Sequence, residues 1–292
     1  MPRDWKMPTT LLCATDLTPA CDRAMERAVQ LAGQWQASLL VIHVIADANV
    51  QKNFTTTANA IEAQLKQKLA ANTAASTLEV EVSVALGDPA QCILDEGDRL
   101  FADMLVLGAG ERTSFRDRLL GSTVDHVLRH TRQPVLTVRN HVGGPYRAIA
   151  IATDFSTPSA DALDCALGLF PETVATVVHV CDDALHGLLP FDRVTGPLAE
   201  RHTREMKEIA EQAMAQFVHP ALARRPHLTT AIEIDSPEEG VRRYVERTGA
   251  DLAVIGTHGR TGWRRAVLGS VAERLIGTLT CDVLAVRPNE IT

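Results

Sequence analysis

A stretch near the end of the chain combines glycine, serine and arginine in a spacing suited to holding an anion. Residues 256–270 read GTHGRTGWRRAVLGS, with Gly256, Gly259 and Gly269 in it and Ser270 directly after the last of these. Glycine lets backbone N–H groups approach an anion because no Cβ stands in the way. A helix that starts at the serine would add free N–H groups and the positive end of its dipole. The stretch therefore predicts a phosphate-binding loop, with an ordinary surface loop as the alternative.

The charges of this loop favour the same chemistry. Arg260, Arg264 and Arg265 lie inside it, and no acidic residue occurs between 257 and 272. His258 also lies in the loop and would contact phosphate when protonated. The spacing matches neither the Walker loop G-x-x-x-x-G-K-[ST] nor the Rossmann fingerprint G-x-G-x-x-G. The class of ligand therefore has to be inferred from the rest of the chain.

The composition is that of a globular protein with an aliphatic core. Of the 292 residues, 46% are hydrophobic but only 4% are aromatic, which suits buried parallel strands. The net charge of −7 argues against broad nucleic-acid binding, which needs a basic face. No run of about 18 apolar residues and no signal-type apolar core occurs, so neither a membrane span nor a secretory signal is expected. The six cysteines form no C-x-x-C pair, which favours reduced thiols and a cytoplasmic location.

The chain is a repeat of two similar halves. The joint between them, NHVGGPYR at 140–147, contains Gly-Gly-Pro and is typical of a linker. We therefore expect two domains of similar fold, 1–142 and 143–292. The matching segments, first half against second, are 11–32 with 148–169, 39–45 with 175–181, 101–123 with 249–271, and 133–139 with 281–287.

Strands and helices are expected to alternate within each half. Thr18-Pro19 and Thr157-Pro158 are predicted to start the first helix of each half, with the hydroxyl as cap and proline at the first helical position. The alternation predicts an α/β fold in which each domain has a five-stranded, mostly parallel sheet with helices on both faces. The apolar runs predict strands at 10–15, 39–45, 78–85, 104–107 and 135–139, and again at 148–153, 175–181, 228–234, 252–255 and 283–287.

Three features of the second half are predicted to meet at one edge of that sheet. Asp154 ends the first strand, His179-Val180 ends the second, and the glycine loop leaves the fourth at Gly256. Ligands of such sheets bind beyond the carboxyl ends of the strands. An acid that ends a buried strand is costly unless it binds something. Asp154 is therefore a candidate binding residue, as is Asp16 at the matching place in the first half.

The spacing G-x2-G-x9-G-[ST], formed here by Gly256, Gly259, Gly269 and Ser270, resembles the nucleotide motif of the universal stress protein family. The ATD at the first strand, the HV of the second strand and the final VLAVR are similar to that family too. The resemblance covers essentially the whole chain, once in each half. The chain resembles the tandem, two-domain bacterial members. This resemblance implies a Rossmann-like fold of the adenine nucleotide alpha hydrolase-like type. It also implies that the closing strands pair across a pseudo-twofold axis, so that one chain is an intramolecular pseudo-dimer, and it leaves open whether two chains form a homodimer.

The resemblance further implies a ligand, ATP with Mg²⁺, and the residues that hold it. Adenine would lie between the first two strands and the phosphates on the glycine loop. Asp154 and Val180 would hold the adenosine end, and Arg260 would add positive charge. The ribose and phosphates would be held by Gly256, Thr257, Gly259, Gly269 and Ser270, with Val271 alongside.

The first half departs from this motif at its middle glycine. Its loop reads GAGERTSFRDRLLGST, so that Glu111 stands where Gly259 stands in the second half. A carboxylate there would repel phosphate by on the order of a few kcal/mol, and Gly110, one residue early, is a poor substitute. ATP is therefore expected mainly in the second domain, and the first is expected to be structural or to bind a different ligand. The site residues that keep their places in the first half are Asp16, Val44, Gly108, Gly121 and Ser122.

No set of residues in the sequence predicts a catalyst or a metal site. No nucleophile, base and orienting group occur together, and His126 and His130, one helical turn apart, lack a third ligand. His43 and His179, at equivalent strand ends, are expected to be core histidines. The expected function is an ATP-binding regulatory module of the stress response, with at most weak ATP hydrolysis. The alternatives are a slow ATPase or nucleotidyl-transferring enzyme of the same superfamily, and a nucleotide-free interaction scaffold.

Overall fold

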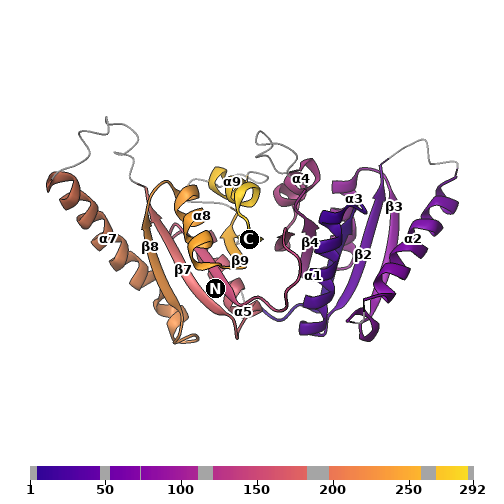
Figure 1. The fold of residues 1–292 in the computed structure, drawn as a ribbon, viewed down its shortest axis with the longest axis horizontal. Coiled ribbons are helices and arrows are strands. Elements are labelled where there is room, and N and C mark those ends of the chain that lie inside the picture. The colour runs from indigo at the N-terminus through magenta and orange to yellow at the C-terminus, as the bar shows by residue number, and fades with distance from the viewer. Residues whose placement is uncertain are drawn as a thin grey trace.

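The structure is a computed structural model that describes residues 5–46, 53–72, 74–110, 121–182, 197–257 and 268–288. The two halves of the chain stand side by side, the first drawn in indigo to magenta and the second in pink to yellow (Figure 1). The first half contains β1 (Thr10–Thr15), α1 (Pro19–Trp35), β2 (Ser38–Ile45), α2 (Phe54–Ala70), a short 3₁₀ turn (Ala75–Thr77), β3 (Val80–Leu86), α3 (Pro89–Arg99), β4 (Met104–Gly108), α4 (Ser122–His130) and β5 (Val135–Val138). The second contains β6 (Ala148–Thr153), α5 (Thr157–Leu169), β7 (Val174–Cys181), α7 (Pro197–Leu222), β8 (Thr229–Ile234), α8 (Pro237–Thr248), β9 (Leu252–Gly256), α9 (Ser270–Thr278) and β10 (Asp282–Val286).

The ten described strands form one sheet in the order β3-β2-β1-β4-β5-β10-β9-β6-β7-β8. Neighbouring strands within each half are parallel. At the joint, β5 and β10 are antiparallel, with Leu136 opposite Leu284. A twofold relation between two parallel sheets requires this reversal, because the rotation inverts the strand direction. The expected α/β fold is confirmed, and the two closing strands do pair with each other.

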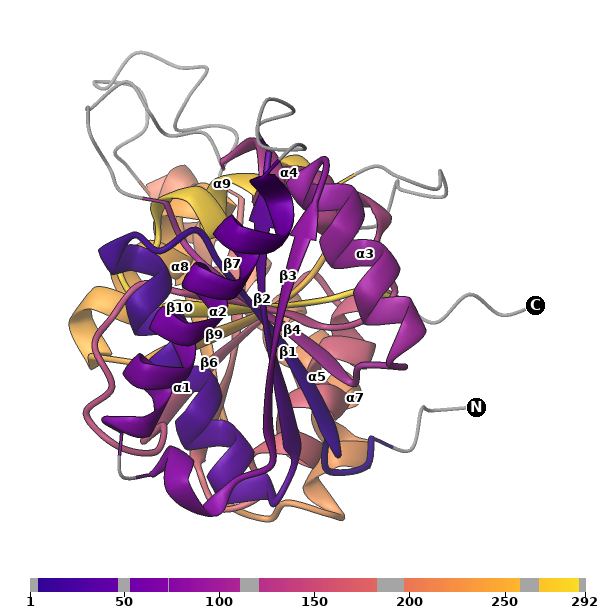
Figure 2. The ribbon, with the colours of Figure 1, turned by 90° about the vertical axis from the view of Figure 1, so that its right-hand side faces the viewer.

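Helices cover both faces of the sheet, which explains the unbroken apolar runs of its strands. Leu11 and Cys13 of β1 belong to a cluster covered by α1, α2, α5 and α7, whereas Leu12 belongs to a cluster covered by α3, α4, α8 and α9. All three side chains are fully buried. Figure 2 shows α1 and α2 on one side of the strands of the first half and α3 on the other. Because the strands within each half are parallel, their carboxyl ends lie along a single edge of the sheet.

The first helix of the second half begins differently from the expectation. Thr18 is the N-cap of α1 and Pro19 its first residue, as predicted. In α5, however, the N-cap is Ser156, whose hydroxyl accepts a hydrogen bond from the Ser159 amide at 3.4 Å, and Thr157 is already helical. The prediction placed this start one residue late because it aligned the two Thr-Pro pairs, whereas proline is tolerated anywhere in the first helical turn.

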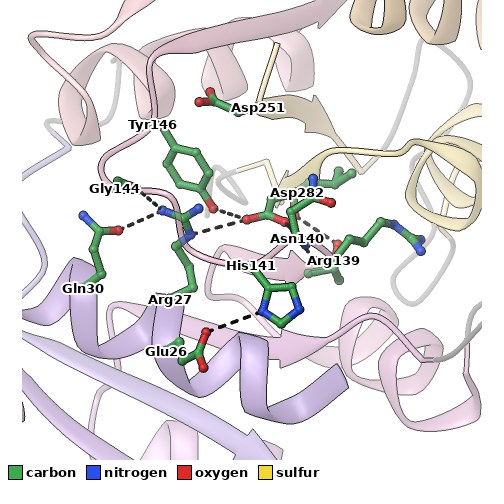
Figure 3. A network of polar contacts seen from close by, with 12 residues as sticks. Glu26, Arg27, Gln30, Arg139, Asn140, His141, Gly144, Tyr146, Asp251 and Asp282 are labelled. Carbon is green, nitrogen blue, oxygen red and sulfur yellow. Dashed lines mark hydrogen bonds and ion pairs between the residues drawn. The ribbon is translucent and has the colours of Figure 1, made fainter. Parts of the chain in front are cut away.

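The joint between the halves is built around a buried polar cluster rather than a loose tether (Figure 3). Asp282 at the start of β10 is fully buried, and its two oxygens accept hydrogen bonds from the Tyr146 hydroxyl at 2.7 Å and the Arg139 amide at 2.8 Å. Arg27 of α1, also buried, pairs with the same carboxylate at 3.4 Å and donates to the Gly144 carbonyl at 2.8 Å. The guanidinium lies 4.1 Å from the centre of the Tyr146 ring. The predicted linker is therefore fixed to both halves.

Two further features concern the helices and the thiols. In the described part of the chain, no helix has both the length and the apolar character that crossing a membrane demands. No disulfide joins any of the six cysteines, of which Cys13, Cys165, Cys181 and Cys281 are buried. Burial raises the pKa of Cys281 to about 12, and it raises that of Cys13 still further. Buried thiols of this kind stay protonated and pack as small apolar side chains.

Candidate functional site

The structure brings the ends of β6, β7 and β9 together at one edge of the sheet, next to the start of α5. β6 lies between the other two strands, and Thr153, its last residue, is opposite His179. A Cβ built on Gly256 would lie only 2.9 Å from the Pro158 carbonyl oxygen and 3.2 Å from the Ser159 amide nitrogen. The last residue of β9 therefore has to be glycine for the strand to pass this close to the helix.

Asp154, the first predicted binding residue, is half-buried and already accepts local hydrogen bonds. Its Oδ1 accepts from the Ser156 amide at 3.0 Å and from the Ser156 hydroxyl. Burial raises the pKa of this carboxyl, but hydrogen bonds from Ser156 and Ser159 outweigh burial and hold it below the ordinary aspartate value. Asp154 is therefore a carboxylate at neutral pH. The turn that it closes supplies a structural reason for an acid at this strand end.

Phe155 is a residue that the sequence reasoning missed. Its backbone is left-handed, with φ of 64°, a conformation that costs energy for a bulky side chain. Its ring stacks on His179 at 4.1 Å and meets Phe217 of α7 edge-on at 5.6 Å. These contacts hold the turn after β6 against the helix layer. The repeated ATD followed by a large apolar residue was the only signal in the sequence.

The strand-end histidines, which the sequence predicted to be core residues, are half-buried and hydrogen-bonded to backbone. The Nδ1 atom of His179 lies 2.8 Å from the Thr153 carbonyl oxygen, and that of His43 lies 2.8 Å from the Thr15 carbonyl oxygen. A carbonyl only accepts, so Nδ1 carries the proton in both rings. Each histidine therefore ties the second strand to the end of the first. Neither contact requires a catalytic role.

Val180 lies under α8 and is almost completely buried, with 9% of its surface exposed. Gly240 of α8 allows this packing, because a Cβ on it would come within 2.6 Å of Val180 Cγ1. The sequence analysis did not single out Gly240, since one glycine in a helical pattern has no distinctive signal. Its role becomes visible only through the strand that it crosses.

The base of the glycine loop is closed by two backbone hydrogen bonds. The Thr257 amide donates to the Val286 carbonyl at 2.9 Å, and the Gly269 amide donates to the Thr257 carbonyl at 2.8 Å. Thr257 is buried, whereas Ser270, the first residue of α9, is exposed. The N-cap of α9 is Gly269, which has no side chain to cover the first N–H groups of the helix.

Several predicted residues of the two loops fall outside the described residues. They are Gly259 and Arg260 of the binding set, together with His258, Arg264, Arg265 and the Glu111 of the first half. Val271, the last residue of the predicted set, is described and packs against the core cluster beneath α8 and α9. The structure therefore places the two ends of the second loop and not its middle.

The first half repeats the strand ends with different side chains. Asp16 accepts from the Thr18 amide at 2.9 Å and the Thr18 hydroxyl at 2.6 Å. Burial raises its pKa, but hydrogen bonds from Cys21 and Thr18 outweigh burial and lower it. A Cβ on Gly108 would lie 2.9 Å from the Cys21 sulfur. Burial, followed by the hydrogen bond to Asp16, raises the pKa of Cys21 to about 11, so the thiol is not a nucleophile at neutral pH.

The other predicted residues of the first half are also placed. Val44 is half-buried on β2, and Gly121 and Ser122 are exposed at the start of α4. His126 and His130 are exposed on the same helix, with their rings stacked at 4.2 Å. Within the described residues, no group of three or more histidine, cysteine, aspartate or glutamate side chains is arranged to hold a metal.

Comparison with known proteins places this architecture in a family. A sequence model of the universal stress protein family matches residues 7–139 and again residues 145–287. A universal stress protein of Methanocaldococcus jannaschii is 32% identical over 144 residues, which are 49% of this chain and 82% of that protein. One of Archaeoglobus fulgidus has a similar structure, with a TM-score of 0.68 at 19% identity over 96% of this chain and 99% of that one. A protein of Pseudomonas aeruginosa described as functionally unknown reaches 0.67 at 19% identity, covering 97% and 94%.

The structural similarities, at this level of identity, establish the fold alone. The two consecutive matches of the family model cover most of the chain and coincide with the two halves of the sheet. The chain therefore belongs to the universal stress protein family, and it carries two copies of the family's domain in tandem.

Proposed function

We propose that this chain binds ATP, mainly in its second copy, and acts as a nucleotide-responsive regulatory module of the stress response. The observation that carries the proposal is the complete G-x2-G-x9-G-S motif of the second copy, at the edge of the sheet where α/β folds bind ligands. Its described members, Gly256, Gly269 and Ser270, lie between the end of β9 and the start of α9. The domains that we propose are 1–142, with the degenerate motif, and 143–292, with the intact one.

The start of α9 has the properties that a phosphate group requires. Because its N-cap is Gly269, no side-chain hydrogen bond closes the free N–H groups of the first turn. Those groups and the helix dipole favour an anion, and the exposed Ser270 adds a hydroxyl donor. Mg²⁺ would arrive with the nucleotide and be bound by its phosphates, as such ions often are. Asp154, ionised at neutral pH, would accept hydrogen bonds from the adenosine end.

The proposal describes a binding protein rather than an efficient enzyme. The residues that it invokes would hold a nucleotide, and the sequence offers no nucleophile, base and orienting group together that would activate water. ATP bound without rapid turnover shifts the balance between two conformations or between partners. The thiols, without a disulfide among them, fit a reducing compartment, and we propose a cytoplasmic location.

The first experiment measures the nucleotide that is bound to protein purified without added ATP. The protein is denatured, and the released nucleotide is separated by ion-pair chromatography and quantified against the protein concentration. Near one ATP per chain supports a single site in the second copy. Two per chain would show that Glu111 is tolerated and that the first copy binds as well. ADP in place of ATP would indicate hydrolysis and favour the slow-ATPase alternative. An empty protein is titrated with ATP, and failure to bind would favour the nucleotide-free scaffold.

A pair of reciprocal variants assigns the site to one copy. Gly259→Glu copies the first loop into the second and is expected to abolish ATP binding. Glu111→Gly is the reverse substitution in the first loop. It restores the motif there and is expected to allow ATP binding rather than to abolish it. Unchanged affinity of Gly259→Glu would contradict the assignment, whereas a second bound ATP in Glu111→Gly would show that the carboxylate alone silences the first copy.

A further inference from the structure

Helix α9, which begins at the proposed phosphate site, is held at both ends by arginines of the first copy. At its first turn, Arg129 Nη2 lies 3.1 Å from Glu273 Oε2. At its last turn, the Arg139 guanidinium donates to the Ile276 carbonyl. Arg129 belongs to α4 and Arg139 follows β5, so both come from the half with the degenerate motif. The position of α9 is therefore set by the other copy as well as by its own sheet.

Arg129 joins two carboxylates that occupy equivalent places. Its Nε donates to both oxygens of Asp125 at 2.9 Å, while its Nη2 reaches Glu273. The Asp125 amide donates to the Gly121 carbonyl at 2.9 Å, and the Glu273 amide donates to the Gly269 carbonyl at 2.9 Å. Each acid is thus in the first turn of the helix that follows a glycine loop. One guanidinium is therefore shared between the helices that follow the two glycine loops, α4 and α9.

Within the described parts of both copies, this bridge has no counterpart on the other side of the pseudo-twofold axis. The two strand-terminal arginines do act reciprocally, since Arg287 Nη1 donates to the Arg129 and Thr131 carbonyls at 2.8 Å each, at the end of α4. The residue of the second copy that matches Arg129, however, is Gly277. Among the residues that the structure describes, the pairing of a first-turn acid with an arginine of the opposite copy is therefore seen for Glu273 of α9 and not for Asp125 of α4.

The charge of Glu273 matters because of where a phosphate would bind. A helix N-terminus carries about half a positive charge, whereas a carboxylate in the first turn carries a full negative one. An unpaired acid would oppose a triphosphate at that end, and the pairing weakens this repulsion, because Arg129 leaves the two carboxylates with one net negative charge instead of two. The side chains of Arg129 and Glu273 are 27% and 33% exposed, so solvent screens the pair only in part.

We propose that Arg129 is a positioning residue for the nucleotide site of the second copy, which it serves by offsetting part of the charge of Glu273 and by fixing its side chain. The degenerate first copy then has a function in nucleotide binding without binding nucleotide itself. This inference rests on the proposed function, since it concerns the same site.

The test compares ATP with adenosine, because only ATP has the phosphates that Glu273 would repel. By calorimetric titration, Arg129→Gln is expected to weaken ATP binding roughly tenfold and to leave adenosine binding nearly unchanged. Glu273→Gln in the same chain is expected to restore ATP affinity, because the charge that needed neutralising is gone. Glu273→Gln alone is expected to bind ATP at least as tightly as the wild type, which keeps a measurement available if Arg129→Gln folds poorly. Arg99→Gln is the matched control, since Arg99 pairs with Glu96 at 2.7 Å on the surface of the same copy.

The outcomes separate this inference from the proposed function. Wild-type protein that binds no ATP overturns both. Wild-type binding together with an unchanged Arg129→Gln overturns only the role of Arg129. Equal losses for ATP and adenosine, not rescued by Glu273→Gln, would mean that the arginine supports the fold of the domain rather than the phosphate end of the site.

Discussion

The two copies are alike where the fold makes a demand and different where a ligand would bind. In both, the residue after the first-strand aspartate is left-handed, with φ of 67° at Leu17 and 64° at Phe155. In both, the strand-two histidine hydrogen-bonds to the last carbonyl of the first strand at 2.8 Å. The glycine motif, by contrast, is complete in the second copy and interrupted by Glu111 in the first. The backbone conformation at the strand ends is therefore needed for folding. The residues of the glycine loop can change while that conformation stays the same.

The side chains next to the last residue of the fourth strand also differ between the copies, although the turn that they stabilise is the same. In the second copy, the Ser159 hydroxyl lies 2.9 Å from the Thr153 hydroxyl and donates to the Ser156 carbonyl at 2.9 Å. In the first copy, Cys21 occupies this place and hydrogen-bonds to Asp16. The two networks close the same turn with different groups, so the turn does not depend on one particular side chain.

The largest effect is expected where the copies are joined, because there a buried ion pair links Arg27 of the first copy to Asp282 of the second. Removing Asp282 leaves Arg27 buried without its ionic partner, so Asp282→Ala is expected to lower the free energy of unfolding by about 3–5 kcal/mol. Urea denaturation followed by circular dichroism measures the change. Glu205→Ala, which removes an exposed pair with Arg201, is the control and should change stability by less than about 0.5 kcal/mol. Equal midpoints for the two variants would show that the cluster does not hold the copies together.

A smaller and symmetric loss is expected at the glycines that end the fourth strands. A Cβ on Gly108 or Gly256 would lie 3.0 Å or less from backbone atoms of the first helix, which cannot move aside easily. Alanine at either position should therefore cost about 1–3 kcal/mol of stability. Gly110→Ala is the matched control, because a Cβ there meets nothing within 4 Å. The same urea titration measures both variants. A loss of stability in only one of them would show that the two halves are not structurally equivalent at this position.

The strand-end aspartates should contribute to acid stability in both copies, more strongly in the second. Each has a folded pKa below its unfolded value near 3.9, so its stabilisation is present above that value and is lost as the pH falls through the folded pKa. Asp154→Asn is expected to lower stability at pH 7 by about 1 kcal/mol and to flatten the decline below about pH 4. Asp16→Asn should do less, because Asp16 is exposed. Melting temperatures between pH 3 and 7 measure both, and a steeper acid decline in either variant would contradict the assignment.

The smallest effect is expected from exchanging the group beneath the fourth strand of the first copy. Cys21→Ser copies the second copy at this place, and serine fits the space of the thiol, so the change in stability should stay within about 1 kcal/mol. The melting temperature measures it, with Ser159→Cys as the reciprocal variant. A loss of several kcal/mol in either would mean that the two turns have become specialised and are no longer interchangeable.

Much of this arrangement can be predicted from the residues in order along the chain. Unbroken apolar runs predict strands that are buried on both faces, and the repeat predicts two α/β units, because both signals are local. The helix start at Ser270 follows from the same reasoning, since it involves neighbours in one strand–loop–helix unit. The close approach at Gly256 does not, because the backbone that it meets belongs to α5, far away along the chain. The start of α5 was placed one residue late because two Thr-Pro pairs looked equivalent, and a difference of one residue leaves no trace in the apolar pattern.

By itself, the sequence determined the class of the fold, the doubling of the domain and the edge of the sheet that carries the candidate site. Only the tertiary structure decided which residues of one copy serve the other. Arg129 and Glu273 are 144 residues apart, and Arg27 contacts the start of β10 from the first helix of the chain. An arginine on an amphipathic helix has the same local pattern whether it faces water or a distant carboxylate. Its partner is set by the antiparallel pairing of β5 with β10, which turns the second sheet about the twofold axis and brings α4 beside α9.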